Sequence, residues 1–240
     1  MMVWVVLLMG LTFLVEACFG FGGGLIAIPL LSLMLAPKDA VFLMLTFQCL
    51  KSVLLVTAWR QIDWSALKFM PIGILAGAVI GTMLLDVVDA QTLRLFLAFY
   101  LILFVAGDYL KFSWRLQAPG QTGSLLAGVS GGLISGLTGM GGPALVTYLR
   151  TQNLPKAQFR ATIIVALTLL NFFRFALDYR DILQSTAVHA YFLPCLAVFC
   201  LVMVLGSRLP KFLSEQRFKA GINVLLLLSA VLLLWRWQVS

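Results

Sequence analysis

Long apolar stretches, separated by short polar connections, run along almost the whole of this 240-residue chain. Six of them have about the 20 residues that a membrane-crossing helix needs: 40–58, 66–85, 93–110, 158–177, 186–206 and 217–237. Four shorter stretches form two adjacent pairs, 3–19 with 24–35 and 123–138 with 142–151. The pattern predicts an all-α polytopic membrane protein in which each short pair is a helix broken in its middle.

Clusters of glycine separate the two members of each short pair. Residues 20–24 read Gly-Phe-Gly-Gly-Gly, and residues 139–143 read Gly-Met-Gly-Gly-Pro, 119 positions later. Glycine destabilises a helix by about 1 kcal/mol relative to alanine, and lipid tolerates broken backbone only where protein or a cavity surrounds it. A helix break repeated in corresponding halves of a membrane chain is typical of a transport site.

The repetition extends beyond the glycines. The Pro-Lys pair at 37–38 recurs at 155–156, and polar connections recur at similar spacing. We therefore interpret residues 1–118 as a first membrane repeat and residues 119–240 as a second, which together form one integral membrane domain.

Two topologies are compatible with the breaks. Each broken segment either crosses the membrane once, which leaves the halves parallel, or returns to its starting side as a re-entrant hairpin, which inverts them. A continuous helix over residues 3–35 would extend roughly 50 Å at 1.5 Å per residue, well beyond a hydrocarbon core of about 30 Å. The hairpin topology also gathers most of the 17 Lys and Arg residues on one side, as cytoplasmic loops require. It predicts inverted repeats, each a hairpin plus three transmembrane helices, with both termini periplasmic in a bacterial inner membrane.

Composition and charge narrow the function classes. The chain is 62% hydrophobic and 11% charged, against about 25% charged residues in soluble domains. Its net charge of +8 comes from residues that flank apolar segments, so we assign it to membrane orientation and expect no nucleic-acid partner. The four cysteines form no CxxC pair and the single histidine no HExxH motif. We therefore expect no metal, no cofactor and no enzymatic activity.

The glycine breaks have the chemistry of an anion site. The second helix of each hairpin starts with backbone N–H groups that have no intrahelical partner, and the helix dipole adds partial positive charge there. Such a terminus can hold an oxyanion, and glycine lets a ligand approach the backbone closely. If the repeats are inverted, the two termini converge near the middle of the membrane. The predicted substrate-binding residues at the breaks are Gly22, Gly23, Gly24, Gly141, Gly142 and Pro143.

Other glycines have a different explanation. Gly73, Gly77 and Gly81 repeat every four residues and therefore share one helix face. Small residues on one face allow two membrane helices to approach closely. We assign these three, together with the glycines of 128–132 and Gly136, to helix packing.

Polar residues inside apolar segments are functional candidates by default. Lys51 lies near the middle of its segment, and Gln48 lies one turn before Lys51. The repeat counterpart of Lys51 is Asn171. Arg174 lies one turn beyond Asn171 on the same helix face. We add Gln48, Lys51, Asn171 and Arg174 to the predicted substrate site. The alternatives are that Lys51 snorkels to an interface and that Arg174 is an interfacial anchor.

Two further titratable residues bear on coupling. Glu16 precedes the first break and is either a proton carrier or a cap of the hairpin. His189 stands near the start of its segment, where we interpret it as an interface residue. A coupling proton therefore remains a candidate partner beside the small anion and the lipid bilayer, and the sequence does not define an oligomeric state.

These motifs resemble the TauE/SafE family of sulfite exporters, also described as 4-toluene sulfonate uptake permeases. The resemblance covers both repeats. It rests on 20–24 with Pro29, on 136–143 with 148–149, and on 159–162 followed by Asn171 and Arg174. It implies secondary transport of a sulfur-containing anion such as sulfite or an organosulfonate, and places Arg160, Thr162, Asn171 and Arg174 in a signature of the second half.

A secondary transporter that works by alternating access is the function we predict. A passive anion channel on the same scaffold is the alternative. A membrane enzyme lacks candidate catalytic clusters, and a scaffold protein would not require duplicated breaks inside the bilayer.

Overall fold

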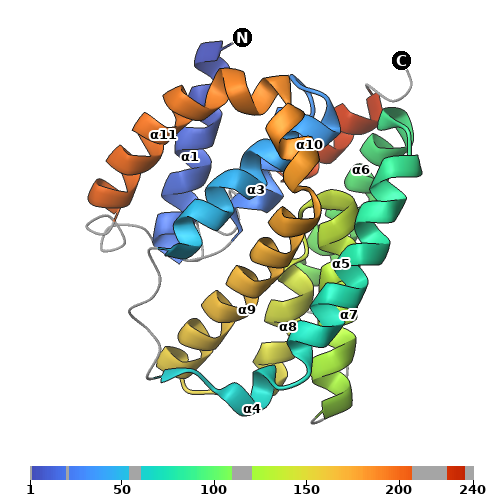
Figure 1. Ribbon diagram of the computed structural model, residues 1–240, viewed down its shortest axis with the longest axis vertical. Coiled ribbons are helices and arrows are strands. Elements are labelled where there is room, and N and C mark those ends of the chain that lie inside the picture. The colour runs from blue at the N-terminus through green and yellow to red at the C-terminus, as the bar shows by residue number, and fades with distance from the viewer. Residues whose placement is uncertain (1, 20–21, 54–60, 110–120, 207–225, 236–240) are drawn as a thin grey trace. The chain divides into compact units, whose positions relative to one another are not determined.

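A computed structural model describes residues 2–19, 22–53, 61–109, 121–206 and 226–235 (Figure 1). Within these ranges the chain forms helices and no strands, which confirms the all-α prediction. The helices are α1 (Met2–Phe19), α2 (Gly23–Leu31), α3 (Pro37–Val53), α4 (Trp64–Leu67), α5 (Met70–Val87), α6 (Ala90–Tyr109), α7 (Gln121–Thr138), α8 (Gly142–Thr151), α9 (Lys156–Leu177), α10 (Tyr179–Gln184) and α11 (Thr186–Gly206). A further apolar helix covers Leu226–Trp235.

Both predicted helix breaks are present. Helix α1 ends at Phe19 and α2 begins at Gly23, while α7 ends at Thr138 and α8 begins at Gly142. Gly20 and Phe21 lie outside the described residues. The six-residue helix α10 occupies the stretch that the sequence suggested only as a polar connection.

Four described helical segments are long and apolar enough to cross a membrane: Trp64–Val87, Ala90–Gly107, Ala157–Leu177 and Thr186–Met203. They correspond to four of the six long segments predicted from the sequence. Of the other two, 40–58 is described only to Val53, and 217–237 only over Leu226–Trp235. The chain is therefore a multi-pass membrane protein.

The helices fall into two compact units, and each draws on both halves of the sequence. The first unit contains Met1–Met44, Val88–Phe112 and Leu183–Ser240. In it, α1 packs against α2 and α11. Phe13 and Phe199 meet edge to face between α1 and α11, with ring centroids 5.1 Å apart.

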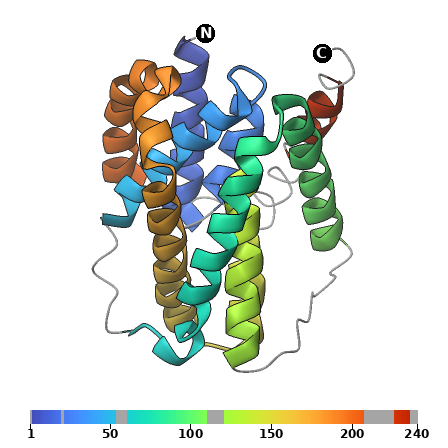
Figure 2. The same ribbon diagram turned by 45° about the vertical axis from the view of Figure 1, so that its right-hand side comes forward.

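The second unit contains Leu45–Val87 and Ser113–Ile182. Figures 1 and 2 show its helices α5 and α7 side by side along their length. The two backbones touch through glycine: a Cβ added to Gly77 would lie 2.1 Å from the Val129 carbonyl oxygen, and one added to Gly128 would lie 2.4 Å from that of Met70. The predicted packing role of the glycine stripes is confirmed. Helix α9 packs against this pair and against α8, so α5, α7, α8 and α9 together hold the second helix break.

Candidate functional site

The break between α1 and α2 depends on a left-handed backbone at Gly22. This residue has φ +97° and precedes the first turn of α2, where its carbonyl accepts from the Leu25 N–H at 3.1 Å. A side chain at Gly22 would meet nothing within 4 Å, so glycine is required here by conformation and not by space. Gly23 and Gly24 are buried in the first turn that follows.

The carboxyl group of Glu16 lies over the start of α2. A Cβ built on Gly23 would be 2.4 Å from Glu16 Cγ and 2.8 Å from its Oε1, and Glu16 is buried. The carboxyl group therefore stands at the amino end of a helix, where the dipole favours negative charge. This position fits the cap that the sequence suggested for Glu16, and it depends on α1 and α2 packing against one another.

At the second break, α8 packs against α7. Gly139 has φ +75°, and its N–H donates to the Ser135 carbonyl at 2.7 Å. A Cβ on Gly141 would lie 2.1 Å from the Gly131 carbonyl oxygen. Close packing against α7 is therefore sufficient to explain why residue 141 is glycine. The substrate role predicted for Gly141 stays a prediction.

The amino end of α8 faces one side of α9. Gly142 is the first residue of α8 and Pro143 the second, and a Cβ on Gly142 would lie 3.3 Å from Leu167 Cδ2. Leu167, Asn171 and Arg174 follow one another at spacings of four and three residues, which places them on one face of α9. The start of α8 thus lies against the face of α9 that carries the predicted polar residues.

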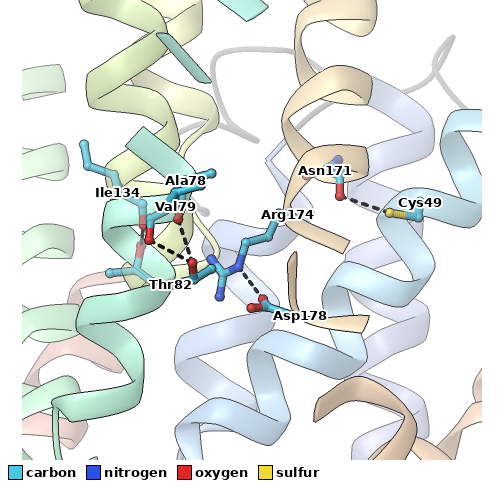
Figure 3. A network of polar contacts seen from close by, with 9 residues as sticks. Cys49, Ala78, Val79, Thr82, Ile134, Asn171, Arg174 and Asp178 are labelled. Atoms are coloured by element: carbon cyan, nitrogen blue, oxygen red, sulfur yellow. Dashed lines mark hydrogen bonds and ion pairs between the residues drawn. The ribbon is translucent and has the colours of Figure 1, made fainter. Parts of the chain in front are cut away.

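Arg174 is fully buried in this unit and only partly paired. Its Nε donates to Oδ2 of Asp178, which is also buried (Figure 3). Nη1 and Nη2 are buried too and have no hydrogen-bond partner among the described residues. Leaving charged donors unpaired away from water is costly, and an acceptor placed at the two Nη groups would remove that cost.

Asp178 was not singled out from the sequence. It follows the last residue of α9, and its N–H donates to the Arg174 carbonyl at 3.0 Å. The signal for its side-chain contact was available, because oppositely charged residues four apart on a helix are neighbours.

On α5, Thr82 bonds back to the carbonyls of Ala78 and Val79 at 2.9 and 3.0 Å. Figure 3 shows the guanidinium of Arg174 extending from α9 on the side of Thr82.

Helix α3 reaches this region at its carboxyl end. The thiol of Cys49 donates to the Asn171 carbonyl at 3.3 Å. Gln48 and Lys51 flank Cys49 and are half-buried. One contact thus links the stretch that carries both predicted residues to α9, and their substrate role stays a prediction.

The other residues of the second-half signature lie apart from this polar face. The Thr162 hydroxyl accepts from the Asp63 N–H at 3.0 Å, and the Asp63 carboxylate in turn caps α4 by accepting from Ser65 N–H at 2.9 Å. Thr162 therefore anchors the loop before α4, while Arg160 is exposed. His189, in the first unit, is also exposed, with Nδ1 2.8 Å from the Ser185 carbonyl oxygen.

Comparison with known proteins agrees with the resemblance in the motifs. The family model described as sulfite exporter TauE/SafE matches residues 5–233. The chain is similar to a protein of Cupriavidus necator named "Probable sulfite/organosulfonate exporter TauE", at 28% identity over 222 residues that cover 90% of this chain and 87% of the relative. No solved structure matches the chain.

Proposed function

Because the chain belongs to the sulfite exporter TauE/SafE family, whose members are exporters and not enzymes, we propose that it is a secondary carrier of a small sulfur-containing oxyanion. Sulfite and organosulfonates are the candidate substrates, since the relative from Cupriavidus necator is named for them. The observation that carries the proposal is Arg174, a buried guanidinium whose two Nη groups lack a partner among the described residues.

The geometry of Arg174 matches a sulfur oxyanion. A guanidinium presents parallel N–H groups that bind two oxygens of one anion at once. Asp178 engages Nε and leaves the Nη pair for the substrate. The first turn of α8 lies farther along the same face of α9, at the level of Leu167. Its free amides and dipole provide a second point of attraction about 10 Å away, at 1.5 Å per residue.

The substrate therefore has two binding positions along one face of α9. We propose that the anion meets the start of α8 and the Nη groups of Arg174 in turn as it moves along α9. Gly22, Gly23 and Gly24 provide the corresponding helix start in the first half. Glu16 already stands over that start, so the α8 terminus is the better candidate for direct substrate contact.

Reciprocal packing supports a pseudo-two-fold relation between the two repeats. In the first unit, α1 of the first half packs against α11 of the second. In the second unit, α7 of the second half packs against α5 of the first. Each unit thus pairs the leading helix of one half with the third long helix of the other, as a pseudo-two-fold relation between the halves requires. We propose that α1–α2 and α7–α8 are re-entrant hairpins in a bacterial inner membrane, with both termini periplasmic.

Transport then follows alternating access, in which one group of helices rocks against the other around the bound anion. The test is purified protein in liposomes, given sulfite, an alkanesulfonate or chloride with and without a pH gradient. A carrier gives saturable sulfonate flux that is accelerated by sulfonate on the opposite side. Flux without saturation or counterflow would instead identify the passive channel, and the absence of any flux of sulfur oxyanions would refute the proposed function.

A variant pair tests the role of the second break. Gly142→Leu places a bulky side chain at the first residue of α8, while Gly142→Ala adds only a methyl group 3.3 Å from the end of a flexible leucine. We expect the leucine variant to insert into the membrane and to lose sulfonate flux, and the alanine variant to retain most of it. Equal flux in both would argue against substrate contact at the start of α8.

A further inference from the structure

We propose that Asp178 is the proton carrier of this transporter and takes up one proton from water when the anion occupies Arg174. This inference rests on the proposed function and adds the group that couples it to a proton gradient. It starts from the geometry of the pair: Asp178 holds one edge of a fully buried guanidinium, whose other two nitrogens are unpaired among the described residues.

Charge balance favours the coupling. Without substrate, Arg174 and Asp178 neutralise one another inside the unit. A monovalent sulfonate on the Nη groups adds one negative charge to a buried pair, and an uncompensated charge away from water is strongly unfavourable. One proton on an Asp178 oxygen restores neutrality, because it leaves a cation, a bound anion and a neutral carboxyl group.

The neighbouring groups favour Asp178 as the protonated carboxylate. Asp86 on α5 acts electrostatically on both members of the pair, and Asp181 on α10 acts on Asp178. Both of these aspartates are exposed, whereas Asp178 is buried. Burial raises the pKa of Asp178 above its ordinary value of 3.8, against the opposing effect of Arg174.

The other elements packed against α9 add few charges. Helix α7 and the four residues of α4 contain no titratable side chain. Tyr148 and Arg150 are on α8, whose first residue lies beside Leu167 of α9. Asp63 caps α4 and is bonded to Thr162, which lies toward the end of α9 opposite to Asp178. From α3, Cys49 contacts the carbonyl of Asn171, and Lys51 follows two residues later.

Asp178 is also well placed to transmit protonation to the backbone. Its N–H donates to the Arg174 carbonyl at 3.0 Å, and its own carbonyl accepts from the Ile182 N–H at 2.9 Å. It is the single residue between α9, which ends at Leu177, and α10, which begins at Tyr179. A change in its side-chain partner acts at a junction between two helices, where orientation can change.

Proton uptake in detergent tests the proposal directly. The probe is methanesulfonate, because its sulfonate does not titrate near neutral pH, whereas sulfite itself does. When methanesulfonate binds, the wild-type protein should take up about one proton from the buffer per anion. Its affinity for the anion should rise by up to about tenfold per unit decrease in pH. Asp178→Asn should bind the anion without proton uptake and change affinity less than about twofold over the same pH range. Asp86→Asn is the matched control: it also removes a carboxylate that acts on the pair but keeps Asp178, so it should still take up about one proton per anion.

Flux measurements keep the proposal falsifiable if one variant folds poorly. In liposomes, a pH gradient should drive methanesulfonate accumulation by the wild type and by Asp178→Glu, and should leave exchange by Asp178→Asn unaffected. Proton uptake or gradient-driven accumulation that persists in Asp178→Asn would overturn the proposal, as would anion binding by the wild type without proton uptake. A wild-type protein that neither binds nor moves sulfur oxyanions would instead refute the proposed function.

Discussion

The contact between α5 and α7 offers a quantitative test of the fold. Gly77 lies against the backbone of α7, and a Cβ there would meet the Val129 carbonyl oxygen at 2.1 Å and the Leu133 nitrogen at 2.7 Å. Both atoms are main chain, so no side-chain rotation can relieve the overlap. Gly77→Ala therefore forces the two helices apart.

The required displacement sets the expected loss of stability. Ordinary van der Waals contact for a Cβ begins at 3.4 Å, which is 1.3 Å beyond the 2.1 Å available at Gly77. Overpacking of this kind costs roughly 1–3 kcal/mol. In a chain of this size each kcal/mol corresponds to about 2–4 °C in the unfolding temperature, so the variant should unfold several degrees below the wild type.

Thermal unfolding of the purified protein in detergent, followed by intrinsic fluorescence, measures this loss. Ala76→Leu is the matched control, because it adds a larger group at the adjacent, exposed position of the same helix. We expect Ala76→Leu to leave the unfolding temperature within about a degree or two of the wild type, since surface substitutions usually change stability by less than about 0.5 kcal/mol. If Gly77→Ala unfolds no earlier than Ala76→Leu, the backbone contact between α5 and α7 is refuted.

Two further predictions concern backbone geometry and a helix cap. Gly22→Ala should destabilise by roughly 1–2 kcal/mol because of its left-handed φ of +97° and not because of a clash; an unchanged unfolding temperature would contradict that backbone conformation. Hydrogen bonds, foremost from the Ser65 side chain, lower the pKa of Asp63 below its ordinary 3.8. Its cap therefore stabilises the folded state fully above that value and less as the pH falls through the lowered pKa, so unfolding temperatures of the wild type and Asp63→Asn should converge in acid. A constant difference would count against the cap.

The sequence predicted features that follow from local pattern. Long apolar segments located the long helices, and glycine clusters located both breaks, because glycine raises the cost of continuing a helix. A spacing of four placed Gly73, Gly77 and Gly81 on one face, and the backbone contacts of α5 with α7 bear that prediction out. These inferences succeed because they depend only on helix periodicity and on residue size.

Features that depend on tertiary contacts were harder to predict. The carboxyl group of Glu16 lies over Gly23 only because α1 and α2 pack against each other. Position 141 has no room for a side chain because α8 packs against α7. The bond from Asp63 to Thr162 spans almost a hundred residues and has no local signal. Asp178 is a different case. Its spacing of four residues from Arg174 can be read from the sequence, but it was interpreted as part of the polar connection that follows the helix.

The central claim is that the Nη groups of Arg174 bind the transported oxyanion, and Arg174→Lys tests it most directly. Lysine keeps the positive charge beside Asp178 but loses the planar fork that binds two oxygens. Calorimetric titration of methanesulfonate into the purified protein should show one site in the wild type and affinity at least about tenfold weaker in the variant, because hydrogen bonds to charged groups contribute about 1.5–3 kcal/mol. Equal affinity in a variant that unfolds at the wild-type temperature would contradict the account.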